Sequence, residues 1–220
     1  MRPSPCCSLV SAALILLAVD CCGAACDTKQ VQFEEKFADL KNWPDLDAAS
    51  SLASIKDGRL TLTVADGKSA GSLYRGDVFE DGDICVAFRL VKTDHKAADE
   101  NGRATAAVIF WGTDWKNNYR FTFAPEDGAT NFEVDRIVGG HYLNVPWSKS
   151  GAVKGVGEVN IIRVSIRGAQ AKYYINDQEV QPGGPLVAHK PEGGSSIGWQ
   201  VGSSSGSQYV WEISSVKVTK

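Results

Sequence analysis

The chain has 220 residues, 43% of them hydrophobic and 22% charged, the balance of an ordinary globular protein with one domain and a substantial core. Its formal net charge is −3, and no stretch concentrates Lys and Arg. This excludes the electrostatic binding of nucleic acid that depends on a basic surface, so we expect no nucleic-acid partner.

The first 25 residues have the pattern of a secretory signal peptide. Arg2 precedes an apolar run from Leu9 to Val19, and small residues follow up to Ala25. The run is shorter than the roughly 20 apolar residues that span a bilayer, although an uncleaved N-terminal anchor is the alternative. We expect a signal peptide over residues 1–25, a domain over 26–220 without a transmembrane span, and export to the periplasm or the extracellular space.

Two of the six cysteines, Cys26 and Cys85, lie outside this leader. Two thiols in an exported protein predict one disulfide between them. The alternative is that Cys26 bears a lipid, as in bacterial lipoproteins, but Gly23 stands where such signals usually carry Leu. The pattern favours the disulfide over lipidation.

After Cys26 the hydrophobic pattern has a period of two. It is clearest in "GRLTLTV" (58–64), "DICVAFRL" (83–90), "NIIRVSIRG" (160–168) and "EISSVKVT" (212–219). Turn sequences such as "KDG" (56–58), "EDGD" (80–83), "VGG" (138–140) and "QPGGP" (181–185) separate these strands. Strands that recur about every 8–12 residues predict an all-β protein, and their number favours a two-sheet antiparallel jelly-roll sandwich.

The longest polar connection is "KTDHKAADENGR", residues 92–103. We interpret it as a solvated loop, and the alternative is a calcium or ligand loop built from Asp94, Asp99 and Glu100. Ca²⁺ prefers about six to eight oxygen ligands in a defined cage, which three carboxylates do not supply. We expect no cofactor, with calcium as the alternative.

Aromatic and polar residues gather in "FWGTDWKNNYR" (110–120), "HYLNVPW" (141–147) and "IGWQV" (197–201). This mixture suits a sugar, because an aromatic ring packs on the apolar face of a pyranose while polar groups bind its hydroxyls. We expect Trp115 and Tyr119 to be exposed, with core packing of the aromatic rings as the alternative. The predicted carbohydrate-binding residues are Trp111, Asp114, Trp115, Asn117, Asn118, Tyr119, Arg120, Glu133, Asp135, Tyr142 and Trp199.

The stretch "NFEVDRIVGG" (131–140) places Glu133 and Asp135 on one face of a strand. It resembles the start of the E-x-D-x-x-E motif of laminarinase-type glycoside hydrolases, but Val138 stands at the position of the final Glu. Hydrolysis by two carboxylates needs an acid that protonates the leaving oxygen. We therefore predict no catalytic residue and treat this pair as hydrogen-bond acceptors.

Two other motifs carry no chemistry in this context. "GSSIG" around Ser196 and "GSSSG" around Ser204 match the nucleophile elbow, which requires a strand–turn–helix in an α/β sheet. His95, His141 and His189 lack the spacing of metal ligands, so we predict no metal site from them.

Three segments, "NNYRFTFAPEDG", "FEVDRIVGGHYLNVPW" and "NIIRVSIRGAQAKYYINDQEV", follow one another over residues 117–180. In this order they resemble concanavalin-A-like lectin/glucanase domains of bacterial exported proteins, over roughly Phe33 to Thr219. The chain also resembles the 3-keto-disaccharide hydrolase domains that share this fold, although "ATAAVIFWGTDWKNNYRFTF" lacks their usual "N-S-G-I-x-x-R" and "G-Y-E-x-Q" elements. The resemblance implies a concanavalin-A-like jelly roll.

The fold hosts lectins, glucanases and structural modules, so it does not fix a function. We predict an exported module that binds a glycan or another cell-envelope component without catalysis. A glycan-active hydrolase or lyase of the 3-keto-disaccharide type is the alternative, and a structural or partner-binding exported domain is the second alternative.

Overall fold

The structure is a computed structural model of the whole chain. It describes residues 26, 30–46, 51–93, 103–126, 129–184, 190, 192–193, 196–203 and 207–220. The expected signal peptide, and the residues Asp94, His95, Asp99, Glu100, His189 and Ser204, lie outside the described residues.

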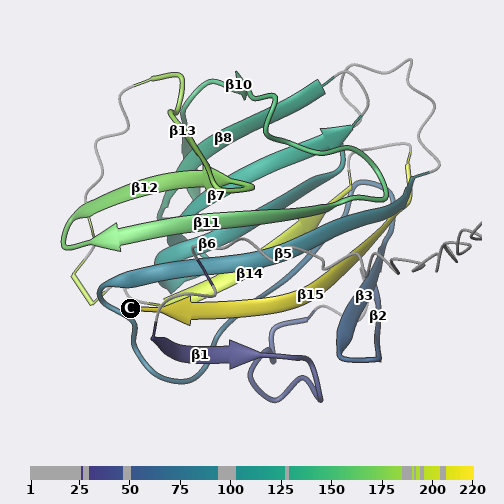
Figure 1. Cartoon of the computed structure of the whole chain (residues 1–220), viewed down its shortest axis with the longest axis horizontal. Coiled ribbons are helices and arrows are strands. Elements are labelled where there is room, and N and C mark those ends of the chain that lie inside the picture. Colours follow the sequence, from purple (N-terminus) through teal and green to yellow (C-terminus); the bar gives the residue numbers. More distant parts are fainter. Residues whose placement is uncertain are drawn as a thin grey trace, which may run out of the picture.

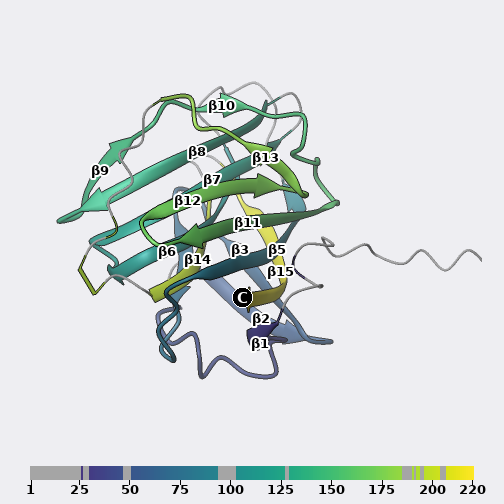
Figure 2. The same cartoon turned by 60° about the vertical axis from the view of Figure 1, so that its left-hand side comes forward.

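The described strands form two antiparallel sheets that face each other (Figures 1 and 2). The first sheet runs, in spatial order, β13 (Gln178–Val180), β12 (Gln170–Ile175), β11 (Val159–Arg167), β5 (Gly82–Thr93), β15 (Tyr209–Thr219), β3 (Arg59–Val64) and β2 (Ser51–Lys56), and β1 (Val31–Glu35) pairs with β15. The second sheet runs β10 (Ser148–Lys149), β8 (Ala129–Val138), β7 (Asn117–Glu126), β6 (Thr105–Asp114), β14 (Ser196–Gly202) and β4 (Ser69–Leu73), and β9 (His141–Asn144) pairs with β8. The predicted two-sheet antiparallel jelly-roll sandwich is confirmed.

The core lies between the sheets and follows the period-two pattern. In β3, Leu60, Leu62 and Val64 are all fully buried, as the alternation predicts. Strand β5 departs from the expected half-buried pattern, because its outer face is covered as well. There Cys85 and Ala87 pack with Cys26 in a small satellite cluster.

The hairpin turn between β12 and β13 is formed by two residues with positive φ that are not glycine. Asn176 and Asp177 join β12 to β13 with φ values of 49° and 65°. Asn and Asp tolerate this left-handed region better than other residues with a side chain. The "ND" turn therefore closes the hairpin without a glycine.

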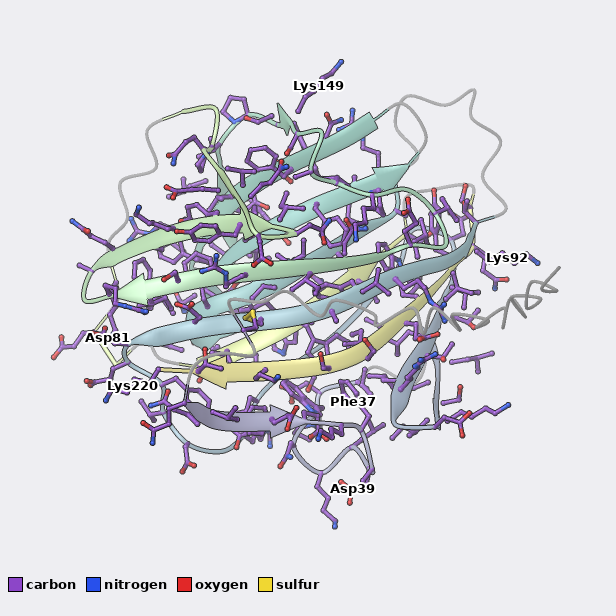
Figure 3. All side chains as sticks on the ribbon, viewed as in Figure 1. Phe37, Asp39, Asp81, Lys92, Lys149 and Lys220 are labelled. Atoms are coloured by element: carbon purple, nitrogen blue, oxygen red, sulfur yellow. A yellow bond between two sulfur atoms is a disulfide. The ribbon has the colours of Figure 1, made fainter. Side chains whose placement is uncertain are left out.

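The disulfide between Cys26 and Cys85 is formed, with the Cα atoms 6.4 Å apart (Figure 3, yellow bond). The predicted pairing is confirmed. Among the helices of the described residues, none combines the length and the apolar character needed to cross a membrane.

Candidate functional site

The outer face of the second sheet, away from the first sheet, is hollowed into a pocket of about 310 Å³. Strands β6, β7, β8 and β14 form its floor, and β9 and the turn before β4 form two of its walls. We call this the outer-face pocket. Its lining residues are Gly67, Lys68, Ser69, Arg103, Thr105, Ala107, Arg120, Thr122, Glu133, Asp135, Tyr142, Gln200, Gly202 and Ser203.

The period of two explains which side chains reach the pocket. On β7, Phe121 and Phe123 point into the core, so the alternate residues Arg120 and Thr122 point outward. On β8, Phe132 and Val134 are core residues and Glu133 and Asp135 alternate with them. The polar floor of the pocket is thus the reverse side of the apolar core.

Four floor residues form a two-by-two grid across β7 and β8. The Cα of Arg120 pairs with that of Asp135, and the Cα of Thr122 pairs with that of Glu133. Opposite residues lie about 4.5–5.5 Å apart in an antiparallel ladder, and alternate residues along one strand lie about 6.5–7 Å apart. All four are nearly buried, with exposed fractions of 7% for Arg120, 8% for Thr122, 8% for Glu133 and 4% for Asp135.

Arg120 is held in place by its neighbours. Its Nη1 donates to Tyr142 Oη over 3.0 Å and also to Gln200 Oε1, and its Nε donates to Asn118 Oδ1 over 3.2 Å. Its guanidinium carbon lies 5.4 Å from the centre of the Tyr142 ring and 5.9 Å from that of Trp115. Burial lowers the pKa of Arg120 from its ordinary value, against the favourable influence of Tyr142 and Asp135.

The two floor carboxyls have no such support. Within the described part of the chain, no donor hydrogen-bonds to Glu133 or Asp135, and Asp135 Oδ1 is shielded from solvent without a partner. Burial and the neighbouring Asp135 raise the pKa of Glu133 from 4.5 to about 8, although Arg103 opposes this shift. Burial raises the pKa of Asp135 from 3.8 to about 6, against the attraction of Arg120. The pKa of Glu133 is thus raised further than that of Asp135.

Three predicted aromatic site residues lie in the core instead. Trp111, Tyr119 and Trp199 are at most 1% exposed and pack between the sheets. The expectation that Tyr119 is exposed is wrong, because Tyr119 alternates with the outward Arg120. These three rings cannot present a face to a ligand in the outer-face pocket.

Trp111 is buried for a reason that simple alternation misses. It follows the core residue Phe110, so strict alternation would point it outward. However, the pairing of β6 with β7 shifts register between Phe110 and Asp114, and Trp111 has a φ of 48°. Such a bulge re-aims a side chain, and here it places both rings in the core.

Two predicted aromatic residues do border the site. Tyr142 on β9 is 55% exposed and lines the pocket. Trp115, in the turn between β6 and β7, is half-buried beside Arg120. Figure 2 shows β9 at the edge of the second sheet, beside β8.

Asp114 and Asn117 serve the turn rather than the pocket, whereas Asn118 serves the turn and also accepts the hydrogen bond from Arg120. Asp114 Oδ1 accepts hydrogen bonds from Lys116 N over 2.7 Å and from Asn117 Nδ2 over 3.1 Å. The Asn117 hydrogen bond is the main reason why the pKa of Asp114 is lowered. Asn118 Nδ2 donates to the carbonyl oxygens of Asp114 and Trp115. These residues fix the turn that carries Trp115.

Several lining residues were missed by the sequence analysis, among them Lys68, Ser69, Arg103, Thr122 and Gln200. A signal existed for Thr122, which follows Arg120 at a spacing of two and alternates with the core residues Phe121 and Phe123. Gln200 similarly alternates with the core residues Trp199 and Val201. Lys68, Ser69 and Arg103 reach the pocket from outside the floor strands. Their contribution to the pocket cannot be predicted from the local sequence pattern.

The histidine and Gly-Ser motifs of the sequence form no second functional site among the described residues. Within the described ranges, no group of three or more His, Cys, Asp or Glu residues is placed to hold a metal ion. Ser196 is the first residue of β14 and His141 the first of β9. The backbone after Ser196 therefore continues as a strand, without the strand-to-helix turn of a nucleophile elbow.

Solved structures with the same architecture are similar to this chain at low sequence identity. The carbohydrate-binding module CBM66 from Bacillus subtilis is 15% identical, with 81% of this chain and 98% of that chain covered and a TM-score of 0.57. The beta-glucanase of Bacillus licheniformis is 12% identical, with 88% and 99% covered and a TM-score of 0.60. The laminarinase from Flavobacterium sp. UMI-01 is 12% identical, with 87% and 100% covered and a TM-score of 0.58. At these identities the similarity shows the fold alone.

No curated protein matches the sequence. The model of the 3-keto-alpha-glucoside-1,2-lyase-like domain, in contrast, matches residues 28–205, which include every lining residue of the outer-face pocket. This match covers well over half of the chain, so the protein belongs to the family of 3-keto-alpha-glucoside-1,2-lyase-like domains.

Proposed function

We propose that the protein binds a glycan in the outer-face pocket. The observation that carries this proposal is the nearly buried acid pair, Glu133 and Asp135, in which Asp135 Oδ1 is shielded from solvent without a hydrogen-bond donor among the described residues. Buried polar groups in folded proteins are normally paired, so an acceptor without a donor suits a ligand that brings one. Sugars carry many hydroxyl donors in a small volume.

Tyr142 supports a sugar as the ligand. Its ring is 55% exposed at the pocket wall, while its hydroxyl is held by Arg120 at 3.0 Å. A fixed, exposed ring is a good surface for the apolar C–H face of a pyranose. The names of the similar structures, a carbohydrate-binding module, a beta-glucanase and a laminarinase, also favour a glycan.

The cellular setting is part of the same proposal. The Cys26–Cys85 disulfide suits an oxidising compartment, because disulfides persist mainly in exported proteins. We therefore place the protein outside the cytoplasm, where a cell-envelope or extracellular polysaccharide is the partner.

A glycan array tests the proposal. The protein is applied to immobilised neutral and charged glycans and compared with Tyr142→Ala and with the matched control Tyr174→Ala. Tyr174 lies on β12 of the first sheet, over Arg163, and alternates with the core residue Tyr173, so it is on the face turned away from the second sheet. We expect binding that Tyr142→Ala weakens at least tenfold and Tyr174→Ala leaves unchanged. No binding to any glycan would favour a structural or partner-binding domain instead.

A second candidate function is cleavage of a 3-keto-α-glucoside. The feature in its favour is that two carboxyls lie one alternate position apart on β8 with unlike pKa values, since burial raises the pKa of Glu133 to about 8 and that of Asp135 to about 6. In a 1,2-elimination, the Asp135 carboxylate takes the proton from carbon 2, beside the keto group. The carbon 1–oxygen bond breaks, a carbon 1–carbon 2 double bond forms, and Glu133 gives its proton to the leaving oxygen.

This second candidate has its own test. The protein is incubated with a 3-keto-α-glucoside at pH 7, and release of the leaving alcohol is followed by mass spectrometry. We expect Glu133→Gln and Asp135→Asn each to slow release at least a hundredfold, whereas the Tyr174→Ala control retains the full rate. Unchanged substrate after incubation with the folded protein would leave binding as the function.

A further inference from the structure

We infer that one end of the outer-face pocket is a subsite for an anionic group of the glycan, a carboxylate or a sulfate, which Lys68 and Arg103 bind above Gly202. This inference rests on the proposed glycan binding. It makes the ligand an acidic saccharide and names the two residues that recognise its charge.

The register of the second sheet divides the pocket floor into three rows. The middle row consists of Cα partners on β14, β6, β7 and β8, namely Gln200, Ala107, Thr122 and Glu133. Arg120 and Asp135 lie one alternate position to one side of it and form the Asp135 row. Thr105 and Gly202 lie one alternate position to the other side and form the Gly202 row. These two outer rows are about 13 Å apart along the strands.

Two cationic side chains flank the Gly202 row. Gly202 on β14 has Ser69 on β4 as its ladder partner on one side and Thr105 on β6 on the other. Lys68 directly precedes Ser69 in the chain, and Arg103 lies two residues before Thr105. Both cations line the pocket. They therefore approach Gly202 from opposite sides, where a single anionic group can accept hydrogen bonds from both.

The floor has no side chain at Gly202. A Cβ at this position would lie 2.8 Å from Thr105 Oγ1 and 4.0 Å from Ser69 Cβ. Glycine therefore leaves room in the pocket floor beside the Thr105 hydroxyl. A hydroxyl can donate a hydrogen bond to an anion oxygen, so the floor adds a neutral donor to the two cations.

Trp147 orients one of these cations. The guanidinium carbon of Arg103 lies 5.2 Å from the centre of the Trp147 ring. Such a contact uses the face of the guanidinium, whereas its N–H groups lie in its plane. Arg103 can therefore keep the ring contact and bind a carboxylate or a sulfate through two parallel hydrogen bonds. Because the ring already restricts Arg103, less side-chain entropy is lost on binding.

The charges of the lining favour an anion at the Gly202 row. The pocket is lined by three cationic and two carboxylic residues, namely Lys68, Arg103, Arg120, Glu133 and Asp135. Asp135 is separated from Gly202 by about 13 Å along the strands and by three strand spacings, about 14 Å, across them. This exceeds the Debye length of about 8 Å at physiological ionic strength, so Asp135 opposes the anion only weakly. Burial raises the pKa of Glu133 to about 8, which lowers its negative charge near neutral pH relative to an ordinary Glu.

The third cation, Arg120, is less suited to an anion. Its Nε and Nη1 already donate to three neighbouring side chains, and Asp135 is its Cα partner on β8. An anion at the Asp135 row would meet this carboxylate at close range. The uncharged part of the saccharide is therefore expected beside Tyr142, and its anionic group at the Gly202 row.

The test uses the whole protein and sugars matched except for charge. The methyl glycosides of glucose and galactose form the neutral set, those of glucuronate and galacturonate the carboxylate set, and the 6-sulfates of the neutral glycosides the sulfate set. Binding is measured at pH 7 by chemical-shift titration of the labelled protein. We expect at least one acidic sugar to bind roughly fivefold or more tightly than its neutral counterpart, and the difference to shrink when salt is raised from about 0.02 M to about 0.3 M. The set that binds more tightly identifies the anion as carboxylate or sulfate.

Lys68→Gln and Arg103→Gln are the diagnostic variants, because each removes one positive charge from the Gly202 row. Each should lower the preference for the acidic sugar roughly threefold or more. Lys56→Gln is the matched control, since it removes the same charge from an exposed position on β2 of the first sheet and should leave the preference unchanged. Thermal unfolding verifies that each variant is folded.

Two results would overturn this inference and leave glycan binding intact. The first is binding of the neutral sugars that equals or exceeds that of their acidic counterparts. The second is an unchanged preference for the acidic sugar in a folded Lys68→Gln/Arg103→Gln double variant. Absence of shifts with every sugar of all three sets would overturn the glycan proposal as well.

Discussion

The buried carboxyl groups of Glu133 and Asp135 are unfavourable for the stability of the fold, yet their positions suit a binding site. Their nearly buried positions disfavour the charged form of each carboxyl, which is why both pKa values are raised. An apolar pair at these positions would cover the sheet at less cost. The acid pair is therefore better explained by a ligand that pairs with it than by stability.

We predict that Glu133→Gln stabilises the protein at alkaline pH. Between pH 4.5 and about 8 the folded state keeps the Glu133 proton while the unfolded chain releases it. The unfolded state then binds fewer protons, so stability falls as pH rises through this window. Glutamine removes this loss, and urea unfolding should show the variant about 1–3 kcal/mol more stable at pH 8 but little changed at pH 4.

Glu158→Gln provides the control for this prediction. Glu158 is exposed in the connection before β11 and does not line the pocket. Its substitution should leave the pH dependence of unfolding as it is in the unaltered protein. Equal slopes for the Glu133→Gln and unaltered proteins between pH 5 and 8 would contradict the assigned cause.

At the scale of elements, the position of Tyr142 depends on two turns that bind each other. Gly139 N donates to Asn117 Oδ1 over 3.0 Å, and Gly140 N donates to the Lys116 carbonyl oxygen over 2.9 Å. The turn from β8 to β9 is thereby fastened to the turn from β6 to β7. Tyr142 and Trp115, which flank Arg120, belong to these two connected elements.

We predict that Gly140→Ala damages both stability and binding. Gly140 has a φ of 84°, a conformation that costs a residue with a Cβ about 1–2 kcal/mol. Relief of this strain would shift β9 and move the Tyr142 ring. Thermal unfolding should show a loss of about 1 kcal/mol, and glycan affinity should fall at least threefold.

Gly151→Ala is the matched control, because an added Cβ there meets nothing within 4 Å and Gly151 does not have a left-handed φ. It should leave stability within about 0.5 kcal/mol and affinity unchanged. If both alanine variants lost the same stability, strain at Gly140 would not be the cause.

The strands themselves could be predicted from the sequence, but the direction in which some of their side chains point could not. Period two correctly assigned Leu60, Leu62 and Val64 to the core of β3. It failed at Trp111, where a bulge reverses the alternation. A bulge depends on how two strands pair, and a single strand's sequence does not state its partner's register.

At the scale of the whole molecule, the period-two alternation and the turn residues were enough to predict the fold, because both indicate the same antiparallel sandwich. The same patterns were not enough to predict the outer-face pocket. The core residues Phe132 and Val134 imply that Glu133 and Asp135 point outward, but not that they lie in a hollow. The hollow exists because β9 and the turn at Gly67 to Ser69 rise beside the floor, and these segments are brought together only by the complete sheet.

The completed sandwich also separates two features on opposite faces. The outer-face pocket lies on the second sheet, and the Cys26–Cys85 disulfide lies on the outer side of the first sheet, where Ala87 and Ile161 pack against it. Phe88, Val108 and Phe121 are among the core residues between them. The disulfide is therefore expected to stabilise the fold without shaping the pocket.

We predict that a Cys26→Ser/Cys85→Ser variant is less stable and still binds glycan. The disulfide links residues 59 positions apart, and closing a loop of that length constrains the unfolded chain by about 2–4 kcal/mol. In a protein of this size, thermal unfolding should shift down by roughly 5–15 °C. Below its melting temperature the variant should bind the array glycans within twofold of the unaltered protein, because no pocket residue touches the disulfide. An unchanged melting temperature would contradict the stabilising role, and lost binding by a folded variant would contradict the independence of the two faces.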